Sequence, residues 1–244
     1  MVQPSLRGAG AAREIHAEVP AVRVHVLVEG KSESELIERW APRAFKGHTF
    51  IAHPHQGKGT LPKNPTHKPD PRRHGLLDLL PATLRAYGSS PNAAGDAVLV
   101  LVDADREDCT KLKAKLVSLV QSTNPRPKVV IRIAVEETEA FYLGDLRALR
   151  IAFPNADMRK ARRYQNDSIV GTAELFGEIV ADGGLNKVHW AEEMGLRLTT
   201  NPSRSTSPSF RALHRGIAKL IAGQPTPGRR SKKHWKARHP GLRK

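Results

Sequence analysis

Acidic side chains recur at three places in the chain, each directly after a run of apolar residues. They are Glu29, Asp103, Asp105, Glu136, Glu137 and Glu139. Carboxylates that pack together repel one another and lose hydration, and a hard divalent cation relieves both penalties. We therefore expect a Mg²⁺ or Mn²⁺ site at which Glu29, Asp103 and Asp105 hold the metal. The pattern leaves open which of Glu136, Glu137 and Glu139 completes it.

The apolar runs that precede these acids predict buried β-strands. The runs span residues 22–28, 97–102 and 129–135, and a shorter strand is expected at 49–52. Helical periodicity between the runs predicts helices that start near Ser32, at 76–87, at 107–121 and at 138–149. Alternation of strands and helices indicates an α/β fold in which helices cover both faces of a parallel sheet. Since ligands bind beyond the carboxyl ends of such strands, the acids are expected to converge on one crevice.

Composition divides the chain into four expected segments. Residues 1–20 have no apolar period and predict a flexible leader, and residues 21–150 form the α/β domain. Residues 151–222 predict a helical extension packed on that domain, with its last helix at 208–221 and Ser207 as N-cap. Residues 223–244 are rich in Pro, Gly, Lys and Arg, which predicts a basic flexible tail.

The charge is concentrated toward the C-terminus. The net charge is +16, and residues 194–244 hold 13 Lys and Arg without one acid, which leaves 27 basic and 24 acidic residues in 1–193. A basic block of this kind indicates a nucleic-acid partner, DNA or RNA, although a solvated tail is the alternative. The residues expected to bind nucleic acid are Lys58, Arg204, Arg211, Arg229, Arg230, Lys232, Lys233 and Lys236.

Other features narrow the class of protein. Cys109 is the single cysteine, which excludes an internal disulfide and a cysteine-based zinc cluster. No apolar stretch is long enough to span a bilayer, so we expect no membrane and a cytoplasmic location. The long loop at 53–73 contains Gly57-Lys58-Gly59, which lacks the pattern of an ATP-binding phosphate loop, and Lys58 is expected to contact phosphate instead.

The order of these motifs resembles a known family. Val28-Glu29-Gly30-Lys31-Ser32-Glu33 after a strand, followed by Val102-Asp103-Ala104-Asp105, resembles the TOPRIM fold of topoisomerases, primases and overcoming-lysogenization-defect (OLD) nucleases. The chain is most similar to a stand-alone TOPRIM-like family of unknown function. The segments 55–59, 133–145, 187–191 and 204–210 support that similarity, which covers roughly residues 22–222.

The resemblance implies roles for particular residues. Glu29 would be a metal ligand or general acid/base, Asp103 and Asp105 would hold the metal, and Glu33 would serve a second metal. Glu137 or Glu139 would complete the site. Lys187 would neutralise charge in the transition state.

The function that these features predict is a divalent-metal-dependent nuclease of TOPRIM type. The resemblance further implies bacterial antiphage defence beside a separate ATPase subunit. Two alternatives remain open: a nucleic-acid-binding subunit without catalysis, and a primase-like nucleotidyl transferase.

Overall fold

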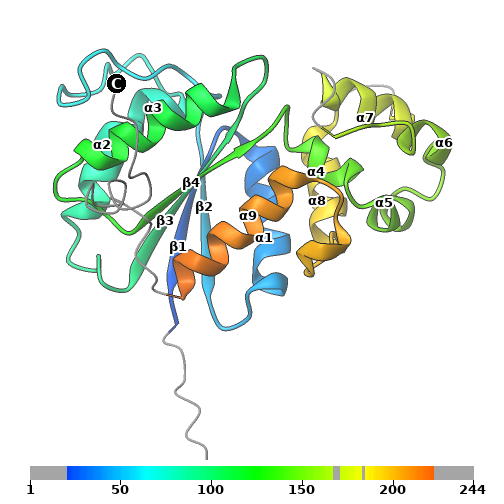
Figure 1. Ribbon diagram of the computed structural model, residues 1–244. Coiled ribbons are helices and arrows are strands. Elements are labelled where there is room, and N and C mark those ends of the chain that lie inside the picture. Colours follow the sequence, from blue (N-terminus) through cyan, green and yellow to red (C-terminus); the bar gives the residue numbers. More distant parts are fainter. Residues whose placement is uncertain (1–20, 167–170, 183–184, 223–244) are drawn as a thin grey trace, which may run out of the picture.

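The computed structural model describes residues 21–166, 171–182 and 185–222 (Figure 1). The expected leader, the expected basic tail, and with it Arg229, Arg230, Lys232, Lys233 and Lys236, lie outside the described residues. Within these ranges the chain forms an α/β fold in which helices flank a central sheet. No helix of this described part is long and apolar enough to cross a membrane.

The sheet has four parallel strands in the order β2-β1-β3-β4. The strands are β1 (Arg23–Val28), β2 (Thr49–Pro54), β3 (Asp96–Asp103) and β4 (Val129–Ala134). The predicted parallel sheet is thus confirmed. The chain adds β2 on one side of β1 and then β3 and β4 on the other. The point where the strand order reverses therefore lies between β1 and β3, which is where open α/β sheets place their ligands.

Helices follow the strands in the predicted alternation. They are α1 (Lys31–Ala44), α2 (Leu76–Gly88), α3 (Cys109–Ser122), α4 (Glu139–Leu143), α5 (Leu146–Ala152), α6 (Met158–Ala161), α7 (Thr172–Val180), α8 (Lys187–Arg197) and α9 (Pro208–Ile221), with a short 3₁₀ helix η1 (Pro202–Arg204) before α9. Ser207 caps α9 as predicted, because its hydroxyl accepts a hydrogen bond from the Phe210 backbone N–H at 3.2 Å.

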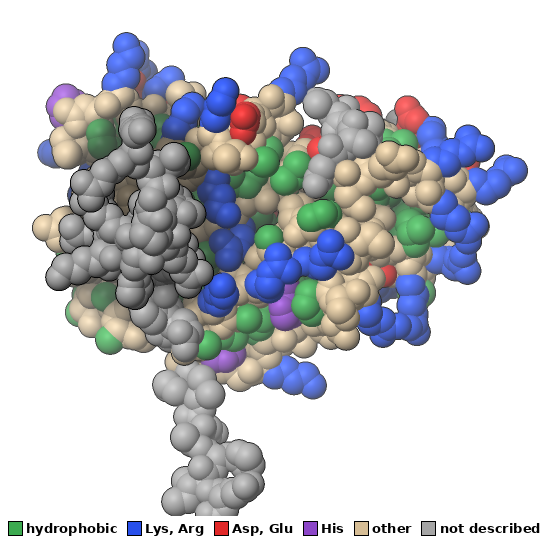
Figure 2. All heavy atoms as spheres, in the orientation of Figure 1, with side chains coloured by type: hydrophobic (Ala, Val, Ile, Leu, Met, Phe, Trp, Pro, Cys, Tyr) green, Lys and Arg blue, Asp and Glu red, His purple; other side chains and the backbone are tan. Residues whose placement is uncertain are grey.

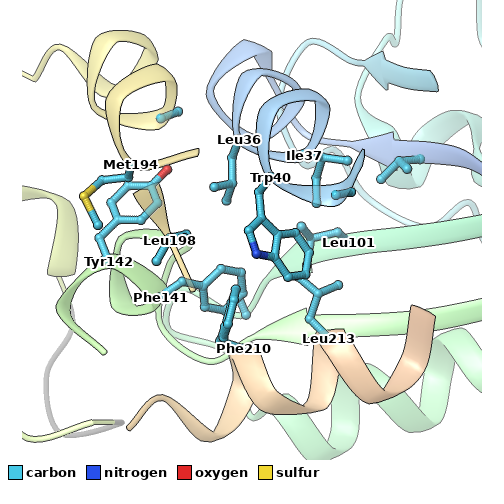
Figure 3. Packing of buried hydrophobic residues seen from close by; sticks show 14 of the residues in the cluster. Leu36, Ile37, Trp40, Leu101, Phe141, Tyr142, Met194, Leu198, Phe210 and Leu213 are labelled. Atoms are coloured by element: carbon cyan, nitrogen blue, oxygen red, sulfur yellow. The ribbon is translucent and has the colours of Figure 1, made fainter. Parts of the chain in front are cut away.

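Each face of the sheet packs against its own set of helices. Alternate residues of β3 point to opposite faces, so Leu99 and Leu101 join one core and Val98 and Val100 join the other. The first core contains α1 and α9, where the Trp40 and Phe210 rings lie 5.0 Å apart between centroids (Figure 3). The second core contains α2 and α3. Burial on both faces explains why the strands are continuous apolar runs.

The helices around the strand ends differ from expectation in two places. The single helix predicted over 138–149 is two helices, α4 and α5, which are separated at Gly144 and Asp145. The Asp145 carboxylate accepts hydrogen bonds from the backbone N–H groups of Ala148 and Thr199, so it starts a new helix and ties it to a distant segment. Ser32 lies inside α1, whose N-cap is Gly30, and its hydroxyl donates to Glu33 instead.

Candidate functional site

The acids that follow β1 and β3 are joined directly. Glu29 Oε1 accepts a hydrogen bond from the Asp103 backbone N–H at 2.9 Å. This contact forms because β1 and β3 are neighbours in the sheet and end side by side. Glu29 and Asp103 therefore lie at the reversal point of the strand order, as predicted from the ends of parallel strands.

Two helices bring further carboxylates to the same place. Glu33 lies in the first turn of α1, buried, and its Oε1 accepts hydrogen bonds from Ser32 Oγ at 2.8 Å and from Thr138 Oγ1 at 3.5 Å. Glu139 is the first residue of α4, and only 1% of its surface is exposed. We call the half-buried Glu29 and the buried Glu33, Asp103 and Glu139 together the buried acidic cluster.

Burial and the charges of neighbouring acids shift the pKa values of Glu29, Asp103 and Glu139. Desolvation raises the pKa of Glu29 to about 7, against the lowering effect of the hydrogen bond from Asp103. Desolvation, and then the charges of Glu33, Glu29 and Glu139, raise the pKa of Asp103 well above its ordinary value. Desolvation also raises the pKa of Glu139 to about 7, although the charge of Lys187 acts in the opposite direction. These carboxyl groups are thus poised to retain protons near neutral pH unless a cation balances their charge.

Several oxygen atoms in this cluster and beside it have no hydrogen-bond partner. Among the described side chains these include Asp103 Oδ1, both carboxylate oxygens of Glu139, and the hydroxyl of Tyr142 one helical turn later. Buried polar atoms are rarely left without partners, and each such group costs about 1–3 kcal/mol. The unpartnered oxygens therefore mark this cluster as a candidate binding site.

Asp105 is placed differently, because its charge is already balanced by Lys58. Lys58 Nζ lies 3.0 Å from Asp105 Oδ2, 2.9 Å from Glu107 Oε1 and 3.3 Å from the carbonyl oxygen of Ala104. Partial burial lowers the pKa of Lys58, but the hydrogen bonds and charges of Glu107 and Asp105 outweigh it, so the pKa is raised overall. We call Lys58 with Asp105 and Glu107 the Lys58 ion pairs.

The three acids after β4 point in different directions. Glu139 joins the buried acidic cluster, whereas Glu137 accepts hydrogen bonds from Lys187 Nζ at 3.2 Å and from the Ala173 backbone N–H at 2.8 Å. The Glu136 carboxylate accepts hydrogen bonds from the hydroxyls of Tyr164 and Thr172. Glu136 therefore holds the segment around α7. Of the three acids after β4, Glu137 and Glu139 remain as candidates to complete the expected metal site.

Lys187 lies beside this group, at the first residue of α8. Besides its bond to Glu137, its Nζ is 4.0 Å from Glu139 Oε1. Burial lowers the pKa of Lys187, but the charges of Glu139 and Glu137 outweigh it and raise the pKa overall. The structure thus brings Lys187, a residue suggested by resemblance alone, into contact with acids that follow β4.

The two described arginines expected to bind nucleic acid lie in η1 and α9. Arg204 is exposed at the end of η1, and Arg211 in α9 donates a hydrogen bond to the Ser205 carbonyl oxygen at 3.1 Å. Within the described ranges, neither forms an ion pair with a carboxylate.

Two residues of this region were not singled out from the sequence. Glu107 extends the Asp103-Ala104-Asp105 pattern by two positions, and this repeated alternation was the available signal. Tyr142 follows Glu139 by three residues in α4, which places both on one side of that helix. Figure 3 shows Tyr142 beside Met194 of α8. Its buried hydroxyl could not be foreseen from an apolar-looking run.

The donor atoms of the buried acidic cluster are carboxylate oxygens, which hard cations such as Mg²⁺ prefer. Among the residues that the structure describes, no three His, Cys, Asp or Glu side chains are arranged to enclose a metal ion by themselves. A zinc-type cage is therefore not formed there. Mg²⁺ is held by one or two carboxylates together with water and substrate phosphates, so the unpartnered oxygens of Asp103 and Glu139 fit that ion.

Cavities beside the loop after β2 lie away from these acids. One is lined by residues of that loop and of α2, and another by its prolines together with Ser118, Leu119 and Ser122 near the end of α3. Neither lining includes a member of the buried acidic cluster. These two cavities therefore do not include the buried acidic cluster.

A family model described as "Domain of unknown function (DUF4276)" matches residues 28–218. The chain belongs to this family. Every member of the buried acidic cluster and of the Lys58 ion pairs lies inside the matched range of the DUF4276 model. The family description names no activity, so the TOPRIM resemblance and what it implies remain predictions.

The other two comparisons returned no relatives. No curated protein matches the chain, and no solved structure matches it.

Proposed function

We propose that this chain is a divalent-metal-dependent nuclease that hydrolyses phosphodiester bonds in DNA or RNA. The observation that supports this function is the buried acidic cluster, whose members lie at or after the ends of β1, β3 and β4, and in which Asp103 Oδ1 and both carboxylate oxygens of Glu139 have no hydrogen-bond partner. Buried like charges are costly in a protein, and they are retained at functional sites more readily than in a structural core.

Each residue of the site would have its own role in the reaction. Asp103 and Glu139 would hold Mg²⁺ or Mn²⁺, and Glu29 and Glu33 would hold its water molecules or complete its ligands. When bound, such an ion supplies positive charge to the phosphate oxygens that gain charge in the reaction. Lys187, beside Glu137 and Glu139, is placed to contribute a further positive charge. Glu29, with a pKa of about 7 before any ion binds, can exchange a proton with water at neutral pH.

The assignment of this nuclease to the TOPRIM type rests on the resemblance of its motifs to that family and not on contacts in the structure. Similarity to the TOPRIM domain of OLD-type nucleases supports a TOPRIM-type reaction, a role in antiphage defence and a separate ATPase as partner.

A cleavage assay tests the proposal. Labelled single- and double-stranded DNA and RNA are incubated with the protein in Mg²⁺, in Mn²⁺ and in chelator. We expect cleavage that requires the metal and is lost in Asp103→Asn, while the matched variant Glu38→Gln, an exposed acid of α1, cleaves like the wild type. Full activity of a folded Asp103→Asn variant would show that the cluster does not carry the reaction.

A second candidate function is nucleic-acid binding without catalysis. Arg211, Arg215 and Lys219 recur at every fourth position of α9 and so lie along one side of that helix, about 6 Å apart. Figure 2 shows Lys and Arg side chains gathered on this face. None of the three forms an ion pair with another described residue. Binding with a steep salt dependence but no cleavage under any metal condition would favour this function.

A further inference from the structure

We propose that the Lys58 ammonium permanently fills one cation position of the acidic site, so that the site takes one divalent ion and not two. The ion would bind at the buried acidic cluster, and Asp105 would be a partner of Lys58 instead of a metal ligand. This inference rests on the proposed function, since it concerns the metal that the nuclease would use.

The contacts around the Lys58 ammonium group are complete. An ammonium group has three N–H donors, and Lys58 Nζ has three acceptors within 3.3 Å, namely Asp105 Oδ2, Glu107 Oε1 and the Ala104 carbonyl oxygen. The side chain is 16% exposed, so water does little to compete with these contacts. Every donor of this cation is thus used, as every ligand position of a bound ion would be.

The backbone around Lys58 is held in place by hydrogen bonds. The Gly57 N–H donates to the Glu29 carbonyl oxygen at 2.9 Å, and the carbonyl oxygens of Gly57 and Lys58 accept from the first two N–H groups of α2 at 2.9 and 2.7 Å. These bonds fix the ammonium beside the strand ends.

The glycines on both sides of Lys58 make this backbone path possible. Gly57 and Gly59 have φ angles of +82° and +67°, which other residues rarely adopt. A Cβ atom at Gly59 would also lie 2.9 Å from the Cα atom of Gly75. The two glycines therefore fix the position of Lys58. A flexible lysine that only contacts phosphate would not need such a constrained backbone.

The buried acidic cluster differs from the Lys58 ion pairs in its lack of close basic partners. Within the described residues, no lysine, arginine or histidine forms an ion pair with Glu29, Glu33 or Asp103, and Lys187 reaches Glu139 only at 4.0 Å. Asp103 Oδ1 and both Glu139 oxygens have no hydrogen-bond partner. Asp105 is therefore paired with a lysine, whereas Asp103 has no basic side chain as a partner among the described residues.

The number of bound metal ions tests this inference. Mn²⁺ is titrated into the full chain by calorimetry, and free Mn²⁺ is counted by electron paramagnetic resonance. We expect one ion per wild-type chain and two ions per chain in Lys58→Met, which vacates the oxygens of Asp105, Glu107 and Ala104. Lys63→Met, an exposed lysine of the same loop, serves as the matched control and should bind one.

The possible results separate this inference from the proposed function. No bound Mn²⁺ in the wild type contradicts the nuclease proposal itself. Two ions in the wild type, or one ion in a folded Lys58→Met variant, overturns the role of Lys58 while the nuclease proposal stands. If Lys58→Met does not fold, anomalous scattering from wild-type crystals soaked in Mn²⁺ decides. A single peak at Asp103 supports the inference, and a peak within coordinating distance of Asp105 overturns it.

Discussion

The buried acidic cluster and the Lys58 ion pairs contain the same kind of side chain only two residues apart, yet their charges are balanced differently. Asp105 lies beside a lysine whose three donors are all used, whereas Asp103 has an oxygen without any partner. Asp105 is half exposed, and Asp103 is buried. An Asp-x-Asp pattern therefore does not assign one role to both of its acids.

The largest expected effect is a difference in Mn²⁺ affinity between two single variants, Asp103→Asn and Asp105→Asn. Asp103→Asn should weaken Mn²⁺ binding more than about 100-fold, because loss of a direct ligand exceeds the 10–100-fold typical of indirect ones. Asp105→Asn should change the affinity less than about threefold. Calorimetric titration of both variants measures the difference. Equal losses in the two variants would mean that Asp103 and Asp105 share one metal, contrary to the comparison.

A smaller effect is expected from the pH dependence of stability in chelator. Burial raises the pKa of Glu29 from 4.5 to about 7, so its protonated form stabilises the fold, and this stabilisation is lost as the pH rises through about 7. Glu29→Gln cannot ionise. Relative to the wild type, its free energy of unfolding should therefore increase by about 2 kcal/mol between about pH 5 and pH 8.

Denaturant unfolding of both proteins at several pH values measures that difference. Burial lowers the pKa of His25, His53 and His214, and their titration acts on stability in the opposite direction. Their contribution is common to both proteins and cancels when the wild type is subtracted. A difference that stays constant with pH would show that Glu29 does not retain its proton in the fold. Added Mg²⁺ should reduce the difference if the cluster binds that ion.

The smallest expected effects are changes in the free energy of unfolding, which should have opposite signs at Tyr142 and at Glu107. Tyr142→Phe removes a buried hydroxyl without a partner, so it should stabilise the metal-free protein by up to about 1 kcal/mol. Glu107→Gln weakens a satisfied but half-exposed ion pair and should destabilise by about 0.5 kcal/mol. Thermal and denaturant unfolding in chelator measure both. Destabilisation by Tyr142→Phe would indicate that the hydroxyl has a partner after all.

Much of the fold follows from local sequence pattern. The apolar runs at 22–28, 97–102 and 129–135 specify strands buried on both faces, and such strands must be parallel and covered by helices. Because parallel strands end at one edge, the positions of Glu29 and Asp103 could be predicted before the structure was known. The N-cap at Ser207 could also be predicted from the sequence, because a capping hydrogen bond joins residues three positions apart.

The tertiary structure alone decided which acids share the buried cluster and which are balanced by lysines. Glu136 has a φ angle of +68°, so the chain turns there, and the next side chains leave in directions that no periodic pattern specifies. Lys58 reaches Asp105 from 47 residues away, through a loop whose path depends on packing against Gly75 and α2. Side-chain direction at turns and contacts between distant segments are set by packing, whereas strand order and strand ends are set by hydrophobic pattern.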